Sequence, residues 1–291
     1  MALDRRIYSS QSLDVPTLGV IPIKSVSISR ERPMEPLMVM GYLKGANQQQ
    51  KGFETFKVDV KTYLTSTMTD GQFKTLFSNT EKGVPSQIEL KTQGAASSFK
   101  GNVVLTSLNI DSTVADFIEV SLSFQGLGNP EIAVNGNMTP ADAPSASRPA
   151  DGIVVLDSSS IKSSIDTYGT TIKSLKFSFE MPVETMTNHK AAMVGNSTTV
   201  MSATTSTLIA KAPYKSSLNL EGQSLINYQG SSTDRGIKLA KVTVGGVNIT
   251  LVNAALKSFS INQSPGEIGA AYSSSYEGTH VGEFSSIAAY L

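Results

Sequence analysis

The segment Phe99–Pro130, FKGNVVLTSLNIDSTVADFIEVSLSFQGLGNP, reads as two strands joined by a short polar turn. In the second strand Val120, Leu122 and Phe124 alternate with polar residues. Strict alternation of this kind is typical of a strand with one buried face and one solvated face. The segment therefore predicts a β-hairpin that packs on a core through one face only.

A second stretch, Val247–Gly282, repeats this plan as VNITLVNAALKSFSINQSPGEIGAAYSSSYEGTHVG. A shift of 151 positions aligns five identical residues within Asn102–Phe124. Average composition would give only about one or two by chance. One extra residue in the second copy then aligns Phe124 with Tyr276. We interpret the two hairpins as a tandem duplication. The identical pairs are Asn102/Asn253, Leu105/Leu256, Ser107/Ser258, Ile110/Ile261 and Ser123/Ser274.

Other strands and one helix follow from the same kind of pattern. Residues Ile23–Glu31 and Phe53–Ser66 alternate, and the strand FKVDVKTYLTS of the first half matches LKFSFEMPVET of the second. Residues 69–83 place Phe73, Leu76 and Phe77 at helical spacing, with Thr69 or Asp70 as a cap and Gly83 as a stop. This short helix must dock on the sheet to be stable.

The domain organisation follows from the repeat and from a change in composition. We predict a mainly β fold with two tandem domains. Residues 1–135 form the first domain, and residues 153–291 form the second. Residues 136–152 are rich in Pro and small polar residues, which indicates a linker. Residues around 187–236, rich in Ser, Thr and Asn, are either irregular strands or a long loop.

Composition limits the kind of partner. Lys and Arg number 24 and so do Asp and Glu, while charged residues make up only 16% of the chain. A net charge of zero disfavours a protein that holds nucleic acid tightly, and it favours a subunit that packs against copies of itself. The chain has no cysteine, which excludes disulfides and thiolate zinc sites.

Targeting signals are missing from the pattern. Residues 1–16 contain no apolar core of the kind found in signal peptides. The chain also has no run of about 18 apolar residues, the length that a membrane span needs. We therefore expect a soluble protein that is assembled in a cytoplasm and has no membrane partner.

Reactive constellations are also missing. The two histidines, His189 and His280, are not at metal-binding spacing, and no nucleophile elbow or phosphate-binding loop occurs. We expect no catalytic residue, no cofactor and no metal site, so the chain is not expected to be an enzyme. The charged stretch SRERPMEPL has two interpretations, salt bridges between subunits or a solvated loop. Its charged residues are Arg30, Glu31, Arg32 and Glu35.

The first hairpin resembles the C-terminal end of tail tube proteins from long-tailed bacteriophages. The family pattern is a Gly-x-hydrophobic-Thr-Ser-hydrophobic strand, a polar turn with an acid, and an alternating strand that ends in an aromatic residue, a polar residue and Gly. The resemblance covers most of residues 20–130 and, more faintly, 152–284. The matching positions are Gly101, Thr106, Ser107, Asp116, Val120, Phe124 and Gly126.

The resemblance implies two tandem β-sandwich or partial-barrel domains, each with a short flanking helix. It also implies a structural protein of the virion, made in the bacterial host cytoplasm. Rings of such subunits stack into a hollow tube that conducts double-stranded DNA during genome ejection. Most family members carry one tube domain and form hexameric rings. Two domains per chain imply homotrimeric, pseudo-hexameric rings. Sheath, tape-measure and baseplate proteins are further implied partners.

DNA must slide through the lumen of such a tube without being retained. Many Lys and Arg side chains in the lumen would bind the DNA phosphates and slow the DNA. We therefore expect a polar inner face with acidic residues. Two alternatives stay open: a distal-tail or baseplate ring protein of tube fold, and a glycan-binding β-sandwich adhesin. The absence of Trp counts against the adhesin. The acidic lumen candidates are Asp59, Asp111, Asp116 and Glu119.

Overall fold

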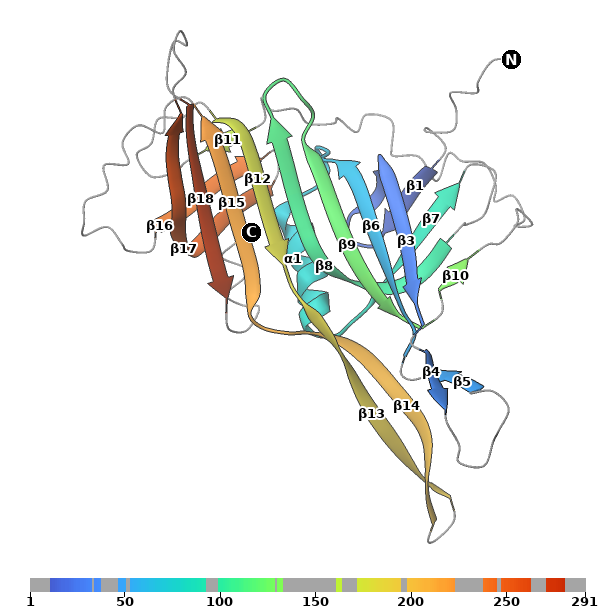
Figure 1. Ribbon diagram of the computed structural model, residues 1–291. Helices are drawn as coiled ribbons and strands as arrows, with labels where there is room; N and C mark the ends of the chain where they lie inside the picture. Colours follow the sequence, from blue (N-terminus) through green and yellow to red (C-terminus); the bar gives the residue numbers. More distant parts are fainter. Residues whose placement is uncertain are drawn as a thin grey trace, which may run out of the picture.

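The computed structural model is mainly β (Figure 1), as the sequence predicts. Among the described residues, fourteen strands form one antiparallel sheet, and four more form two separate hairpins. The linker predicted at 136–152 lies outside the described residues. The structure describes residues 11–32, 34–37, 47–50, 53–92, 99–128, 130–132, 161–163, 172–194, 198–222, 238–244, 247–262 and 271–280.

The first half of the chain supplies one end of the sheet, in the order β3-β6-β9-β8-β7-β1-β2. The short hairpin β4–β5 leaves the sheet between β3 and β6. The strands of the first half are β1 (Gln11–Val15), β2 (Gly19–Pro22), β3 (Ser25–Glu31), β4 (Met34–Leu37), β5 (Asn47–Gln50), β6 (Thr55–Tyr63), β7 (Ser86–Thr92), β8 (Phe99–Thr113), β9 (Glu119–Leu127) and β10 (Glu131–Ile132).

The second half continues the same sheet in the order β12-β15-β18-β17-β16-β11. The hairpin β13–β14 extends beyond the sheet as a long arm (Figure 1). Of the insertion predicted around 187–236, the described residues up to 222 are strand apart from residues 211–213, and residues 195–197 and 223–236 lie outside the described residues. The strands are β11 (Ile161–Ser163), β12 (Ile172–Glu180), β13 (Val183–Val194), β14 (Thr198–Ala210), β15 (Tyr214–Gly222), β16 (Lys238–Val244), β17 (Val247–Asn262) and β18 (Ala271–His280).

One pairing order occurs in both halves. The order of neighbours β3-β6-β9-β8-β7-β1 recurs as β12-β15-β18-β17-β16-β11. In both halves the chain forms a separate hairpin between the first and second strands of this order, β4–β5 after β3 and β13–β14 after β12. The registers agree in detail. Leu105 pairs with Phe124 directly before a β-bulge, and Leu256 pairs with Tyr276 directly before another. The two bulges therefore lie 151 residues apart along the chain.

Two details of the sequence alignment need correction. Beyond the bulges Ser107 pairs with Ser123, and Ser258 pairs with Ser275. The counterpart of Ser123 is therefore Ser275 and not Ser274, because the extra residue lies in the connection between the strands. In addition, β12 takes the place of β3 in the pairing order, and it is β15 that corresponds to β6. Alternation identified β12 as a strand but not its neighbours.

Strand β8 joins the two halves. Its first residues pair with β7, and its later residues, 107–113, pair with residues 174–180 of β12. Hydrogen bonds continue at both ends of this junction. The Met181 amide donates to the Thr106 carbonyl and the Val114 amide donates to the Lys173 carbonyl, each at 2.8 Å. The β8–β12 junction thus makes one sheet of both halves.

The predicted helix is confirmed as α1 (Asp70–Glu81). The Thr69 amide donates to Gln72 Oε1 at 2.8 Å and so begins the helix with a capping interaction. Gly83, with a φ of +65°, ends it in the left-handed region that favours glycine. Among the described residues α1 is the only helix, so the flanking helix expected in the second half has no counterpart there.

The helix packs on the apolar face of the sheet. Phe73, Leu76 and Phe77 are buried, and the Thr80 hydroxyl donates to the Leu105 carbonyl at 2.8 Å. Side chains of β1, β2 and β7 join the same hydrophobic cluster as those of β6, β8, β9 and β12. Across the strands whose side chains the structure describes, the core therefore lies on one side of the sheet and the other side faces solvent.

Candidate functional site

Polar side chains cover the face of the sheet opposite the core. The register aligns them in rows that cross from the first half into the second, and every member is half-buried or exposed. One row contains Ser27, Asp59, Ser123, Ser107, Glu180 and Lys215. The next contains Ser25, Lys61, Ser121, Asn109, Ser178 and Ser217. A third contains Tyr63, Glu119, Asp111, Lys176 and Asn219.

The register that creates this polar face is strongly specified. Residues between the rows point to the core, and Leu108, Leu122 and Phe179 are all at most 1% exposed. Because side chains alternate with a period of two, a slip of one residue would bury every row and expose the core. We call the surface made by the three rows the polar face.

Three of the four acidic candidates lie on the polar face, each beside a lysine. Asp59 Oδ1 is 3.2 Å from Lys57 Nζ and accepts a hydrogen bond of 2.6 Å from Ser123. Asp111 Oδ2 is 3.3 Å from Lys176 Nζ across the β8–β12 junction. These carboxylates are thus balanced by neighbouring cations, so the face is mixed in charge rather than acidic.

Glu119 is the third of these acids, and it forms an ion pair with Lys24. The hydrogen bond that Lys24 donates to this carboxylate raises the pKa of Lys24. Asp116, the fourth candidate, lies in the turn after β8, where it accepts a hydrogen bond of 2.8 Å from the Phe117 amide. It belongs to the edge of the sheet and not to the rows.

The lysine partners were not singled out from the sequence. Lys57 stands two residues before Asp59 on β6, so a same-face pair was predictable from period two alone. Lys176 and Asp111 come from different halves, and only the pairing of β8 with β12 brings them together. No local pattern indicates that contact.

The four charged residues after Ser29 do not form one cluster. Arg30 makes an ion pair with Glu54 of the same chain, whose side chain is only 10% exposed. The hydrogen bond from Arg30 lowers the pKa of Glu54. Glu31 is exposed at the end of β3 and Arg32 follows it, whereas Glu35 lies in the separate hairpin, opposite Gln49.

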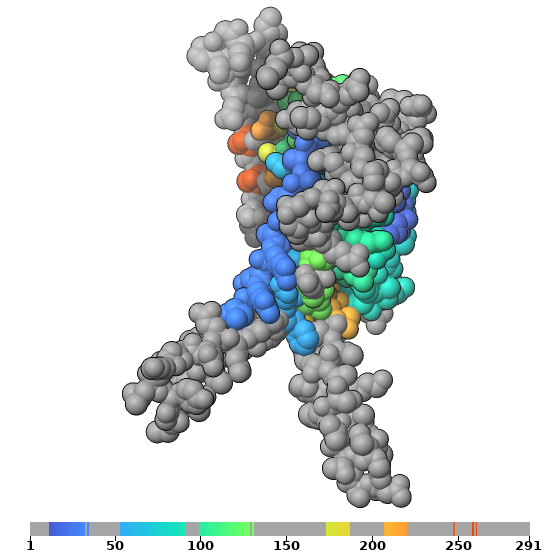
Figure 2. Space-filling view, turned by 90° about the vertical axis from the view of Figure 1, so that its right-hand side faces the viewer, coloured from blue at the N-terminus to red at the C-terminus, as the bar shows by residue number. Residues whose placement is uncertain are grey.

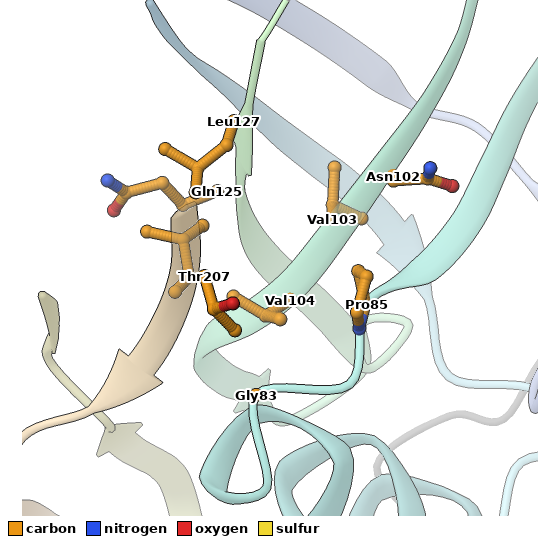
Figure 3. A pocket seen from close by; sticks show the side chains of 9 residues that line it. Gly83, Pro85, Asn102, Val103, Val104, Gln125, Leu127 and Thr207 are labelled. Atoms are coloured by element: carbon orange, nitrogen blue, oxygen red, sulfur yellow. The ribbon is translucent and has the colours of Figure 1, made fainter. Parts of the chain in front are cut away.

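A cavity of about 250 Å³ lies where the arm meets the end of α1 (Figure 3). None of its lining residues is ionisable, so the cavity offers no acid–base pair. Nor do the described residues contain a group of His, Cys, Asp or Glu suited to a metal ion. The lining residues are Gly83, Pro85, Asn102, Val103, Val104, Gln125, Leu127, Thr207 and Leu208.

A comparison with protein-family models and with curated proteins finds no match. In the described part of the chain, no helix has the length and apolar character that crossing a bilayer requires. The features of the described structure that bear on function are the polar face and the two ends of the sheet.

The two ends of the sheet are edge strands. Among the described residues β3 pairs with β6 alone, so its other edge has no strand beside it. Residues 255–262 of β17 pair with β18 on one side, while β16 covers only the earlier part of β17 on the other. An edge strand such as β3 favours pairing with another chain.

Proposed function

We propose that this chain is a structural subunit of a bacteriophage tail tube, built from two tandem tube-like β domains at residues 1–135 and 153–291. In this proposal, rings of the chain stack into a hollow tube of the virion that conducts DNA during ejection. The resemblance of the first hairpin to tail tube proteins supports the family. The recurring strand order supports the duplication.

The observation that carries the proposal is the β8–β12 junction. Within one chain, the first half and the second half already pair edge to edge over seven residue pairs, with their polar rows in line. A head-to-tail contact of this kind, repeated between chains, closes into a ring or continues as a helix. Closure removes every lateral edge from the sheet.

Ring size follows from the number of repeats. Tail tube rings of the resembled family contain six tube domains, and this chain supplies two. Three chains then complete one ring, with pseudo-six-fold symmetry. The sheath, the tape-measure protein and the baseplate are the partners that such a tube requires. We place the β13–β14 arm outside the lumen, where it does not obstruct DNA.

The polar face suits the wall of a DNA channel. Lys176 on this face is paired with Asp111, and Lys57 beside this face is paired with Asp59, so these cations are balanced by neighbouring carboxylates. A phosphate-binding surface would release counterions and retain the DNA. A wall of Ser, Asn and balanced charges lets the polymer slide.

Negative-stain imaging of the purified full-length chain tests this proposal. We expect rings or hollow tubes, with assembly promoted by raising the protein concentration. Single particles at every concentration would overturn the proposal. Solid fibrils would also overturn it, because they would indicate sheet stacking without a lumen.

A further inference from the structure

We propose that Phe117 of one chain inserts into the cavity at the base of the β13–β14 arm of a second copy, and that this contact stacks one ring on the next. The contact rests on the proposed function, because it joins successive rings of the tube. An exposed aromatic turn lies at one end of β9, and an open apolar cavity lies at the other end.

The turn between β8 and β9 presents an apolar surface. Residues 113–117 are exposed at every position. Val114 and Phe117 belong to the exposed large apolar side chains of the described residues, and Phe117 is the one aromatic residue among them. Its ring contacts Tyr63 edge to face, with the two centroids 5.8 Å apart. This contact holds the ring in place while 52% of the residue stays exposed, so little side-chain freedom is lost on binding.

The cavity of about 250 Å³ at the base of the arm suits one aromatic side chain (Figure 3). Val103, Val104 and Leu208 give it a buried apolar wall, while Pro85 and Asn102 at its border are exposed, so it opens to solvent. Its volume is below the range of about 300–1,000 Å³ that is usual for drug-sized ligands. An apolar cavity of about 150 Å³ already admits a benzene ring.

Phe117 cannot reach the cavity of its own chain. Gln125 and Leu127, which line the cavity, lie at the far end of β9. From residue 117 to residues 125–127 the strand rises about 26–33 Å, at roughly 3.3 Å per residue. Figure 1 shows the β8–β9 connection at one end of the sheet and the arm at the opposite end, and Figure 2 shows the base of the arm, in orange, near the lower end of the molecule. A second copy displaced along the strands brings ring and cavity together.

Stacking of rings is the assembly that such a contact produces. Ring closure by lateral pairing leaves the strand ends facing the rings above and below. A contact between opposite ends of two copies is heterologous, so it repeats from ring to ring and extends the tube. Three chains in each ring give three such contacts between successive rings, which strengthens a modest single contact.

The charges beside the turn and the cavity are complementary. Asp116 directly precedes Phe117, and Lys82 directly precedes Gly83 of the cavity wall. Both are exposed, and neither side chain forms a salt bridge among the described residues. When Phe117 enters the cavity, Asp116 approaches Lys82 of the second copy. Opposite charges then orient the two copies, and the buried ring anchors them.

Charge exchange tests this contact in the full-length chain. Asp116→Lys and Lys82→Glu each bring like charges together, so each should give single rings at concentrations where wild type gives tubes. The double variant Asp116→Lys/Lys82→Glu restores opposite charges and should restore tubes. The matched control is Lys215→Glu, at an exposed lysine of the polar face that β8 and β12 separate from β9. It should form tubes as wild type does.

Removal of the ring tests the cavity separately. Phe117→Ala leaves both charges in place and should also give single rings, because the apolar anchor is lost. Negative-stain imaging and sedimentation velocity measure rings and tubes, and circular dichroism checks that every variant folds. If Phe117→Ala forms tubes as wild type does, the ring of a second copy does not fill the cavity and the inference is overturned.

The remaining outcomes separate the two proposals. Tubes from Phe117→Ala and from both single charge variants would overturn the contact and leave the proposed function standing. Single rings from the double variant would overturn the pairing of Asp116 with Lys82. Linear oligomers of wild type without rings, lost in the same variants, would support the contact and overturn the tube. No assembly of wild type at any concentration would overturn both.

Discussion

The aromatic ring of Phe77 lies 4.6 Å from the ring of Phe179, with the two planes inclined at 74°. Phe77 belongs to α1 and Phe179 to β12, so the helix of the first half packs on a strand of the second half. Both side chains are at most 1% exposed. This edge-to-face contact lies beneath the β8–β12 junction and supports it from the core.

We predict that Phe77 and Phe179 are energetically coupled. Phe→Leu at either position nearly conserves volume but removes the aromatic contact, so each change should cost about 1 kcal/mol. A double-mutant cycle in urea should give a coupling of about 0.5–1.5 kcal/mol. Phe117→Leu, at a ring that is 52% exposed, is the control and should change stability by less than about 0.5 kcal/mol. Additive effects would mean that the contact does not hold the junction.

Gly126 should tolerate no side chain. A Cβ at this position would overlap the ring of Phe56 and would lie 2.6 Å from the Asn102 carbonyl oxygen. Gly126→Ala should therefore destabilise the fold by about 1–3 kcal/mol or more.

The matched control for Gly126 is Gly71→Ala in α1. A Cβ there meets nothing closer than Thr69 Oγ1 at 3.9 Å, and alanine favours helix. This change should stabilise by about 0.5–1 kcal/mol. Thermal unfolding of both variants measures the difference, and equal melting temperatures would refute the packing around Phe56.

Acid should weaken the contribution of Glu54. Arg30 lowers the pKa of this carboxyl below its ordinary value of 4.5, so its stabilising effect is fully present above that value. The effect is lost as the pH falls through the lowered pKa. The stability advantage of wild type over Glu54→Gln should be constant from about pH 7 to about pH 5 and shrink below that range. Urea midpoints across this range measure it, and an advantage that persists to about pH 2 would contradict the ion pair.

Removing acids from the polar face should make it bind DNA. The variant Asp59→Asn/Asp111→Asn/Glu119→Gln leaves three lysines without their partners. With three phosphate contacts, affinity for a short duplex should fall about forty-fold between about 50 mM and 200 mM salt. Fluorescence anisotropy measures this slope. Wild type should show no such salt-dependent binding, and tight binding by wild type would refute a wall that lets DNA slide.

Local patterns predicted strands, faces and the helix, but not most neighbours. The alternation of Val58 and Val60 fixed which face of β6 is buried, and Thr69 with Gly83 delimited α1. Which strands pair depends on contacts between distant residues, such as Asp111 with Lys176, and alternation carries no information on them. For that reason β12 was matched to the wrong strand of the first half.

The β13–β14 arm was left open for a related reason. Its residues are rich in Ser, Thr and Ala and lack a strict alternation, so a period of two does not indicate which of them share a face. Asp59 and Asp111 show what alternation predicts and what it does not. Period two placed Asp59 on the polar face, whereas the neutralising partner of Asp111 came from the other half of the chain.

In the proposed assembly, two repeats in each chain build a closed ring from three chains. Cryo-electron microscopy of the assembled protein, with the symmetry determined without imposing it, tests this stoichiometry. We expect three-fold rings with six similar β units around a hollow lumen that the polar face lines. Six chains in each ring, or a lumen lined by the face that packs against α1, would contradict it.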